Sequence, residues 1–168
     1  QRLAFDNTPY GVSIISADNP EKRLYLNQRL VEMFGADSVE QLVSRSPVES
    51  YVNPQDMRNL RLSSGLSGFV KVAEMERVRM DGTRWRCRLH RYRANFEGED
   101  VIIAWHEDIT ELEATKKARQ DLSKAIERIP TAIALFDEED CLVFCNDHYR
   151  KIMETIGDIL ISGVSFEQ

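Results

Sequence analysis

Two histidines, His90 and His106, are the side chains in this sequence with the clearest potential to bind a metal ion or a haem. Residues 83–93 alternate between polar and apolar side chains, which places His90 on the arginine-bearing face of a strand. We therefore expect His90 to face solvent or a partner protein. His106 precedes Glu107 and Asp108 at the end of another strand, but no further ligands stand at a metal-binding spacing. We expect no metal site.

Three cysteines could act as reactive thiols or form a disulfide. Cys87 alternates with Trp85 and Leu89, so we expect a small core residue rather than a sensor thiol. Cys141 and Cys145 lie four residues apart in one apparent strand, which is too far for a disulfide. An odd number of cysteines without regular spacing indicates reduced thiols and favours a cytoplasmic location.

Seven arginines gather between residues 77 and 93, in a chain whose net charge is −6. Nucleic-acid binding would favour a positive chain with aromatic residues between the basic ones, so we expect no nucleic-acid partner. A solvated strand face, or salt bridges between subunits, explains the arginines better. No apolar run approaches the roughly 18 residues of a membrane span, so we expect no membrane insertion.

The elements that position these residues follow from hydrophobic periodicity and capping residues. Residues 11–17 and 23–26 read as two strands around a turn and predict a hairpin. Short helices are predicted after Asn27, after Ser38 in a capping box, and after Asn53, which precedes a proline. Three longer strands follow, and they are predicted at residues 70–80, 83–94 and 101–105. Separate groups of helices and strands indicate an α+β fold with an antiparallel sheet.

The last of these strands runs into a charged helix with no glycine, proline or loop between them. Thr110 and Glu113 match a capping box, in which the threonine hydroxyl accepts the Glu113 amide and the Glu113 carboxylate accepts the Thr110 amide. Residues 111–129 are therefore predicted to form an amphipathic linker helix that ends at Pro130. Its apolar residues follow a coiled-coil spacing and predict a homodimer; they are Leu112, Leu122, Ile126 and Ile129.

The segment around Asn27 resembles the segment around Asn146, and the distance between them is that of tandem domains rather than of solenoid repeats. We therefore divide the chain into a domain at residues 1–110, the linker helix, and the N-terminal part of a second, truncated domain at residues 130–168. That second part lacks the later strands, so it cannot bury a complete core. The chain begins without methionine, and we interpret it as a fragment of a longer protein.

The order of these elements and several short motifs resemble a PAS domain. The motifs are Asn27 after the second strand, Asn-Pro-Gln-Asp at 53–56, Asp-Gly-Thr-Arg-Trp at 81–85 and Asp-Ile-Thr at 108–110. The resemblance covers residues 3–110, and a second, truncated copy follows the linker. It implies a PAS fold, with a five-stranded antiparallel sheet, short helices on one face and a C-terminal linker helix.

PAS domains are sensory and dimerisation modules, in bacteria usually upstream of histidine kinase or diguanylate cyclase domains. The resemblance implies a module of a two-component system in which the linker helix regulates a downstream histidine kinase in the same chain. Two alternatives stay open: a diguanylate cyclase as the output domain, and a small-ligand receptor whose pocket matters more than its dimer. The sequence names neither the ligand nor the sign of regulation.

In the PAS family, the Asp-Ile-Thr motif ties the last strand to the signalling helix. The resemblance therefore implies that Asp108 pairs with a basic residue near the three-stranded meander and that Thr110 bonds the backbone near Trp85. The predicted signal junction consists of Trp85, Asp108, Ile109, Thr110 and Glu113.

Haem-binding PAS domains generally take their histidine from the third helix, and residues 53–66 contain none. Flavin-binding relatives use a cysteine between the short helices, and residues 36–56 contain none. We expect neither cofactor, and no catalytic site, since no nucleophile stands with a base. A small-molecule ligand between sheet and helices stays open; the candidate lining residues are Leu26, Phe34, Tyr51, Met57, Leu60, Phe69, Leu89, Ile103 and Trp105.

Overall fold

The computed structural model of the chain comprises two compact units, Gln1–Glu113 and Ala114–Gln168. All residues predicted to line a pocket fall within the first unit. The structure describes residues 5–19, 21–62, 71–96 and 98–153.

The first unit opens with a hairpin and a short helix. Strands β1 (Gly11–Ser16) and β2 (Arg23–Leu26) pair antiparallel, and α2 (Gln28–Met33) packs against β1. A Cβ atom at Gly11 would lie 2.7 Å from Cδ1 of Leu30 and 2.8 Å from the sulfur of Met33. Glycine at this position therefore allows the close approach of α2 to the strand.

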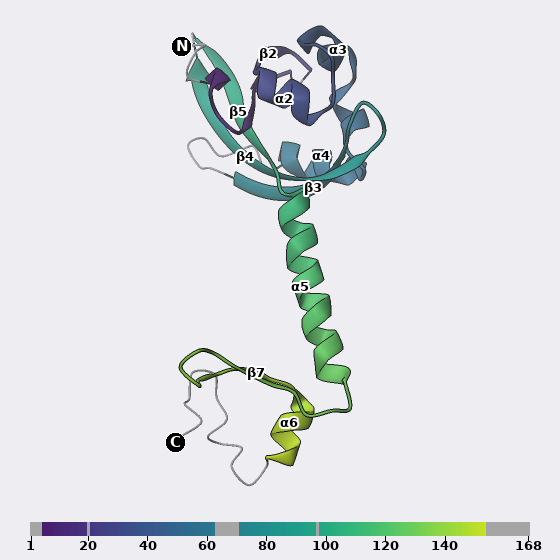
Figure 1. Ribbon diagram of the computed structural model, residues 1–168. Coiled ribbons are helices and arrows are strands. Elements are labelled where there is room, and N and C mark those ends of the chain that lie inside the picture. The colour runs from purple at the N-terminus through teal and green to yellow at the C-terminus, as the bar shows by residue number, and fades with distance from the viewer. Residues whose placement is uncertain (1–4, 20, 63–70, 97, 154–168) are drawn as a thin grey trace. The chain divides into compact units, whose positions relative to one another are not determined.

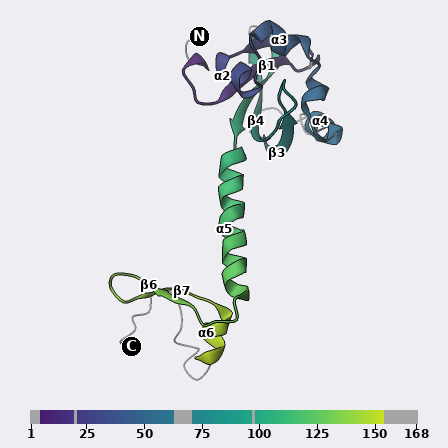
Figure 2. The same ribbon diagram turned by 45° about the vertical axis from the view of Figure 1, so that its right-hand side comes forward.

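Two further short helices, α3 (Val39–Ser44) and α4 (Pro54–Leu62), flank the one-turn helix η1 (Pro47–Ser50). The helices α3 and α4 begin where the sequence predicts, because the side chains of Ser38 and Asn53 each accept an amide N–H of the first helical turn. In Figures 1 and 2, α2, α3 and α4 lie on the same side of the sheet.

Three longer strands complete the sheet: β3 (Lys71–Val78), β4 (Arg84–Phe96) and β5 (Glu99–Asp108). The five strands are antiparallel and lie in the order β2-β1-β5-β4-β3, so β5 is central and pairs with both β1 and β4. Gly82 has a φ of 85°, which suits the predicted turn between β3 and β4. The predicted α+β fold with a five-stranded antiparallel sheet is confirmed.

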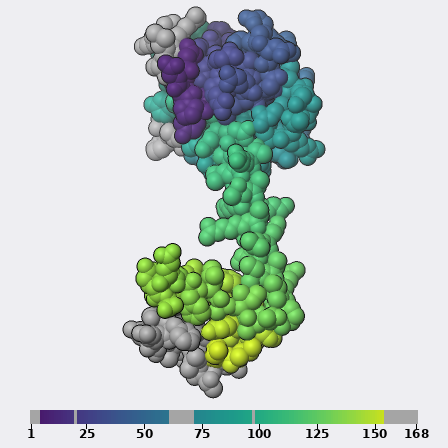
Figure 3. Space-filling view, in the orientation of Figure 1, coloured from purple at the N-terminus to yellow at the C-terminus, as the bar shows by residue number. Residues whose placement is uncertain are grey.

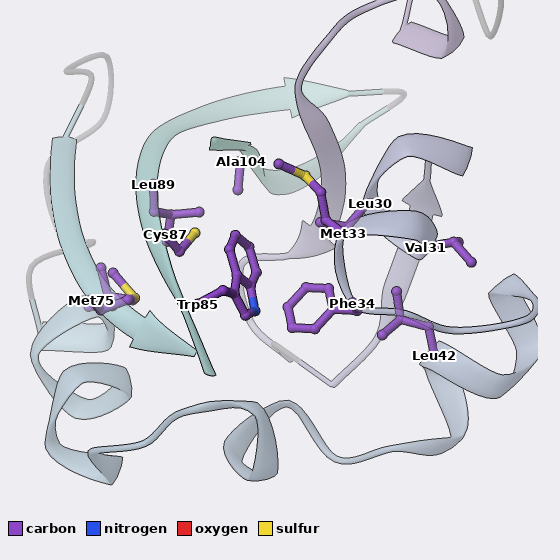
Figure 4. Close-up of a cluster of buried hydrophobic side chains, with 11 residues drawn as sticks. Leu30, Val31, Met33, Phe34, Leu42, Met75, Trp85, Cys87, Leu89 and Ala104 are labelled. Atoms are coloured by element: carbon purple, nitrogen blue, oxygen red, sulfur yellow. The ribbon is translucent and has the colours of Figure 1, made fainter. Parts of the chain in front are cut away.

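The core of the first unit lies between the inner face of the sheet and the helices. In Figure 4, the ring of Phe34 lies beside that of Trp85. The two ring centroids are 5.3 Å apart, and the rings meet in an edge-to-face arrangement. Aromatic pairs of this geometry contribute about 1 kcal/mol beyond the area that they bury. Trp85 is fully buried, so this contact fixes the start of β4 against the end of α2.

Helix α5 (Thr110–Arg128) follows β5 after the single residue Ile109. None of its side chains is buried, and Figure 3 shows its green side chains projecting outward. Within the described residues, no helix combines the length and the apolar character that crossing a membrane requires.

The second unit repeats the opening motif of the first. It contains the antiparallel strands β6 (Ala134–Phe136) and β7 (Leu142–Cys145), followed by α6 (Asp147–Ile152). Asn27 and Asn146 make corresponding contacts. Each caps the helix that follows it, and each side-chain oxygen also accepts an amide N–H from the first segment of its hairpin. The sequence repeat is therefore also a repeat of local structure.

Candidate ligand cavity and signal junction

A cavity of about 400 Å³ lies between the sheet and the short helices of the first unit. Its lining is largely apolar and includes Leu30 from α2, Leu60 from α4 and Leu89 from β4. Four arginines, one histidine and one aspartate also line it. A space of this size and composition suits a small organic molecule.

Six of the nine residues predicted to line a pocket do line this cavity: Leu26, Phe34, Tyr51, Met57, Leu60 and Leu89. The prediction is wrong for Ile103 and Trp105, which lie on the opposite face of β5, whereas their neighbours Ile102 and Ala104 line the cavity. Successive residues of a strand point to opposite faces of the sheet, and β5 carries apolar residues on both faces. Its sequence therefore does not show which face points toward the core. Phe69 lies outside the described residues.

His106 is a cavity residue that the sequence analysis missed. It is 6% exposed, and its Nε2 lies 3.2 Å from the hydroxyl of Ser13. Burial, and then the positive charges of Arg77 and Arg91, hold the pKa of His106 well below 6.5. The imidazole is therefore neutral near pH 7. No group of three or more potential metal ligands occurs in the part of the chain that the structure describes.

The arginines of β3 and β4 do not share one solvated face. Arg77 is 5% exposed, and both Arg77 and Arg91 line the cavity. The expectation of a solvated face is wrong for these two residues, because their parity in the strands turns them toward the core side of the sheet. Arg88, on the other face, pairs with acidic residues of β3 and β5 at 2.9 and 3.0 Å within the same chain.

Cys87 is also fully buried, and its sulfur lies 3.8 Å from Nδ1 of His106. Burial raises the pKa of the Cys87 thiol to about 11. A reactive cysteine needs an exposed thiolate, so this position supports a packing role over a sensor role.

The end of β5 is bonded to the neighbouring hairpin. The Asp108 carboxylate accepts a hydrogen bond from Arg79 at 2.6 Å, and the Thr110 hydroxyl oxygen accepts the amide N–H of Arg86 at 2.9 Å. Asp108 also accepts the amide and the hydroxyl of Thr110, at 3.0 and 2.5 Å. Partial burial by itself would raise the pKa of Asp108, but the hydrogen bonds from Thr110 and Arg79 lower it below its ordinary value. The partners are those that the family resemblance implied, since Arg86 follows Trp85 directly.

Thr110 does not form the predicted capping box with Glu113. The Glu113 amide donates to the carbonyl oxygen of Ile109 at 2.9 Å, and Thr110 is itself the first residue of α5. Asp108 accepts the Thr110 amide in place of Glu113, while the Thr110 hydroxyl bonds β4. The Thr110–Glu113 motif predicted the wrong partner, because a local pattern does not show that a neighbouring strand offers the threonine hydroxyl another amide donor.

Thr110→Val is expected to lower the free energy of unfolding of the chain by about 1–2 kcal/mol, because it removes two hydrogen bonds that usually contribute about 1 kcal/mol each. Valine has nearly the shape of threonine, but it can neither accept the amide of Arg86 nor donate to Asp108. Urea unfolding followed by tryptophan fluorescence measures the change. Thr115→Val, at an exposed position of the same helix, is the matched control, and equal losses in both variants would contradict this role of Thr110.

The apolar residues of the predicted helix seam are largely exposed. Leu112, Leu122 and Ile129 are 55%, 62% and 40% exposed, and Ile126 is partly buried. The carbonyl oxygens of Ile126 and Ile129 accept hydrogen bonds from Nδ2 of Asn146, at 3.3 and 3.5 Å. The C-terminal end of α5 is therefore held within the second unit.

Comparison with known proteins places this fold in a family. The family model described as PAS domain matches residues 1–69. The PAS domain of an HTR-like protein from Haloarcula marismortui is 29% identical, with a TM-score of 0.54, and the match covers 64% of this chain and 88% of that one. No curated protein sequence matches this chain.

Two more distant structures show the same fold. A PAS domain from a two-component sensor histidine kinase is 13% identical, with a TM-score of 0.51 and coverage of 64% of this chain and 91% of that one. A Rhodobacter sphaeroides LOV protein is 16% identical, with a TM-score of 0.54 and coverage of 70% and 72%. The family model covers the first hairpin and the short helices, and β3, β4 and β5 complete the sheet of the first unit. Residues 1–69 therefore match the PAS domain family, and the first unit has the fold of these PAS domain structures.

Proposed function

We propose that this PAS domain is a sensory and dimerisation module of a bacterial signal-transduction protein, which regulates a downstream histidine kinase in the same chain through α5. The observation that carries this proposal is the direct passage from β5 into α5, with Asp108 and Thr110 both bonded to the hairpin of β3 and β4. We further propose that the chain is itself non-catalytic, contains neither haem nor flavin, and works in the cytoplasm without nucleic acid or membrane insertion.

The central strand offers a physical path from the cavity to the helix. Ala104 and His106 line the cavity from β5, and Asp108 lies two residues beyond His106 on the same strand. A ligand or partner that shifts β5 therefore also shifts the residues that anchor the first turn of α5. Only Ile109 separates the two elements, and it is buried, so no loop absorbs the displacement.

The second part of the proposal is a homodimer through α5. Leu112 and Leu122 are more than half exposed, and an apolar stripe of this spacing suits pairing with a second copy of the same helix. The stripe is interrupted by polar Thr115 and Arg119, so the pairing is weak. A weakly packed helix pair can change between two arrangements, as a regulatory linker requires.

Two other outputs remain alternatives. The fold shared with a PAS domain of a two-component sensor histidine kinase supports the kinase output over a diguanylate cyclase. A small-ligand receptor, in which the cavity matters more than the dimer, is supported by the cavity volume of about 400 Å³. An insertion experiment in α5 distinguishes a receptor that only binds a ligand from a module that passes a signal through this helix.

Inserting one residue after Glu113 is expected to change the output strongly, because it rotates the rest of α5 by about 100° relative to the sheet. Inserting seven residues nearly restores the phase and is expected to restore regulation. The measurement is autophosphorylation of a chimaera in which this chain replaces the sensory region of a histidine kinase, for insertions of one to seven residues. The same residues inserted in the exposed turn between β6 and β7 are the control. Kinase activity that does not depend on the helical phase of the insertion would contradict the proposed coupling between the sheet and α5.

A further inference from the structure

The cavity contains a buried positive charge that the protein itself satisfies only in part. Arg77 extends from β3, its Nε donates to the carbonyl oxygen of Ser50 at 3.1 Å, and its Nη2 donates to the Ser50 hydroxyl at 2.7 Å. Its guanidinium carbon lies 4.0 Å from the ring centroid of Tyr51 and 5.0 Å from that of Phe34. The third nitrogen, Nη1, is buried and has no hydrogen-bond partner among the described residues.

An unsatisfied buried nitrogen on a charged group is unfavourable, so its position is informative. A buried donor without a partner costs about 1–3 kcal/mol, and more when the group is charged. Arg77 is held in place by Ser50 and by the two rings, so its Nη1 cannot reach solvent by a change of rotamer without losing those contacts. Arg77 lines the cavity, so a ligand that enters the cavity meets a guanidinium whose hydrogen bonds are only partly satisfied.

The other arginines of the cavity leave its positive charge in place. Arg23 donates to the carbonyl oxygens of Leu42 and Arg45, at 2.6 and 3.0 Å, and Arg91 donates to the carbonyl oxygen of Leu60 at 2.8 Å. Carbonyl oxygens satisfy hydrogen bonds but neutralise no charge. Among the described residues, Arg45 is the one cavity arginine within ion-pair distance of an acid, at 3.7 Å from Glu49.

The arginines also act on one another. Burial lowers the pKa of Arg23 and of Arg91, and the charge of Arg77 lowers the pKa of Arg23 further. Asp18, the single acid among the described residues of the lining, is exposed. An anion in the cavity would relieve this repulsion, whereas a cation would add to it.

We propose that the natural ligand of this cavity is a small molecule with one carboxylate and an apolar body, and that the carboxylate binds Nη1 of Arg77. The inference rests on the proposed sensory function and names its ligand class. One guanidinium nitrogen without a partner suits a carboxylate, which can accept a charge-assisted hydrogen bond through one oxygen, whereas a phosphate monoester carries more charge and more acceptor oxygens. The apolar remainder of the molecule would contact Leu30, Met57 and Leu60.

The test compares ligands that differ only in the charged group. Isothermal titration of the whole chain with 4-phenylbutyrate and with its primary amide, 4-phenylbutanamide, is expected to show at least ten-fold tighter binding of the carboxylate. Equal affinities, or no binding of the carboxylate at millimolar concentration, would overturn the proposal. 3-Phenylpropyl phosphate is the third probe, and tighter binding of the phosphate would overturn the choice of a carboxylate.

Arg77→Met removes the charge while it keeps an unbranched side chain of similar width, and it is expected to reduce carboxylate affinity to that of the amide. Arg84→Met is the matched control, because Arg84 lies at the exposed start of β4 and does not line the cavity. Unchanged carboxylate binding in Arg77→Met would overturn the assignment to Arg77. If Arg77→Met does not fold, the comparison of acid, amide and phosphate in the unmodified chain still decides the ligand class.

The two proposals fail separately. Binding is measured on the chain without an output domain, so it does not depend on transmission through α5. Carboxylate binding with an output that ignores helical phase would contradict the proposed coupling alone. A phase-dependent output without preference for the carboxylate would contradict the ligand assignment alone.

Discussion

Asn27→Ala is expected to lower the free energy of unfolding of the first unit by about 3 kcal/mol, because it leaves buried backbone groups without partners. The Asn27 side chain is 1% exposed. Its oxygen accepts the amides of Val12 and Leu30 at 2.7 and 3.0 Å, and its Nδ2 donates to the carbonyl oxygens of Phe5 and Tyr10 at 2.8 and 3.0 Å. One side chain thus joins the N-terminal segment, β1 and α2.

Asn53→Ala provides the matched control for this prediction. Asn53 also precedes a helix and accepts one amide, that of Gln55 at 3.0 Å, but its side chain is exposed. Loss of an exposed N-cap is expected to lower the unfolding free energy by about 1 kcal/mol. Urea unfolding of both variants, followed by tryptophan fluorescence, measures the difference. Equal effects at the two positions would show that Asn27 acts as a helix cap and nothing more.

Acidification is expected to destabilise the first unit through His106. In the unfolded chain, a histidine takes up a proton near pH 6.5. In the folded chain, burial, and then the charges of Arg77 and Arg91, hold the pKa of His106 well below that value, so the imidazole stays neutral at a lower pH. The lowered pKa means that the unfolded chain binds more protons below pH 6.5. The stabilisation is complete above pH 6.5 and is lost as the pH falls from 6.5 toward the folded pKa.

Between pH 7 and pH 5, this histidine is expected to lower the unfolding free energy by about 2 kcal/mol, provided that the folded imidazole stays neutral over that range. The measurement is urea unfolding at half-unit intervals of pH, for the unmodified chain and for His106→Gln. Carboxylates titrate in both proteins, so the difference between the two curves isolates the histidine. Parallel curves would contradict the assignment of a buried neutral imidazole.

Local sequence patterns predicted much of the fold. Asp81-Gly82 specifies the β3–β4 turn, since glycine adopts a positive φ there, and Ser38 and Asn53 specify helix starts through their own side chains. These signals act within a few residues, so they can be recognised without knowledge of the rest of the chain. The family motifs implied a basic partner near the meander for Asp108 and a backbone partner near Trp85 for Thr110, and the structure identifies these partners as Arg79 and the amide of Arg86.

The errors arose where several elements compete for the same group. Thr110 had a suitable cap partner in its own helix, but the amide of Arg86 on β4 was placed closer to its hydroxyl by the pairing of β4 with β5. The inward face of β5 was assigned to Ile103 and Trp105, because an apolar run in a central strand carries no polar residue to mark its outer face.

By itself, the sequence determined the succession of strands and helices along the chain and the turns between them. It also determined the caps of α2, α3 and α4, and the repeat of the Asn27 motif around Asn146. Only the tertiary structure decided the polarity of the cavity. A run of alternating arginines predicts a solvated face, because burial of a charge without a partner is unfavourable. Arg77 is nevertheless buried, since Ser50 and the rings of Tyr51 and Phe34, distant in sequence, meet it in the folded sheet and leave one nitrogen without a partner among the described residues.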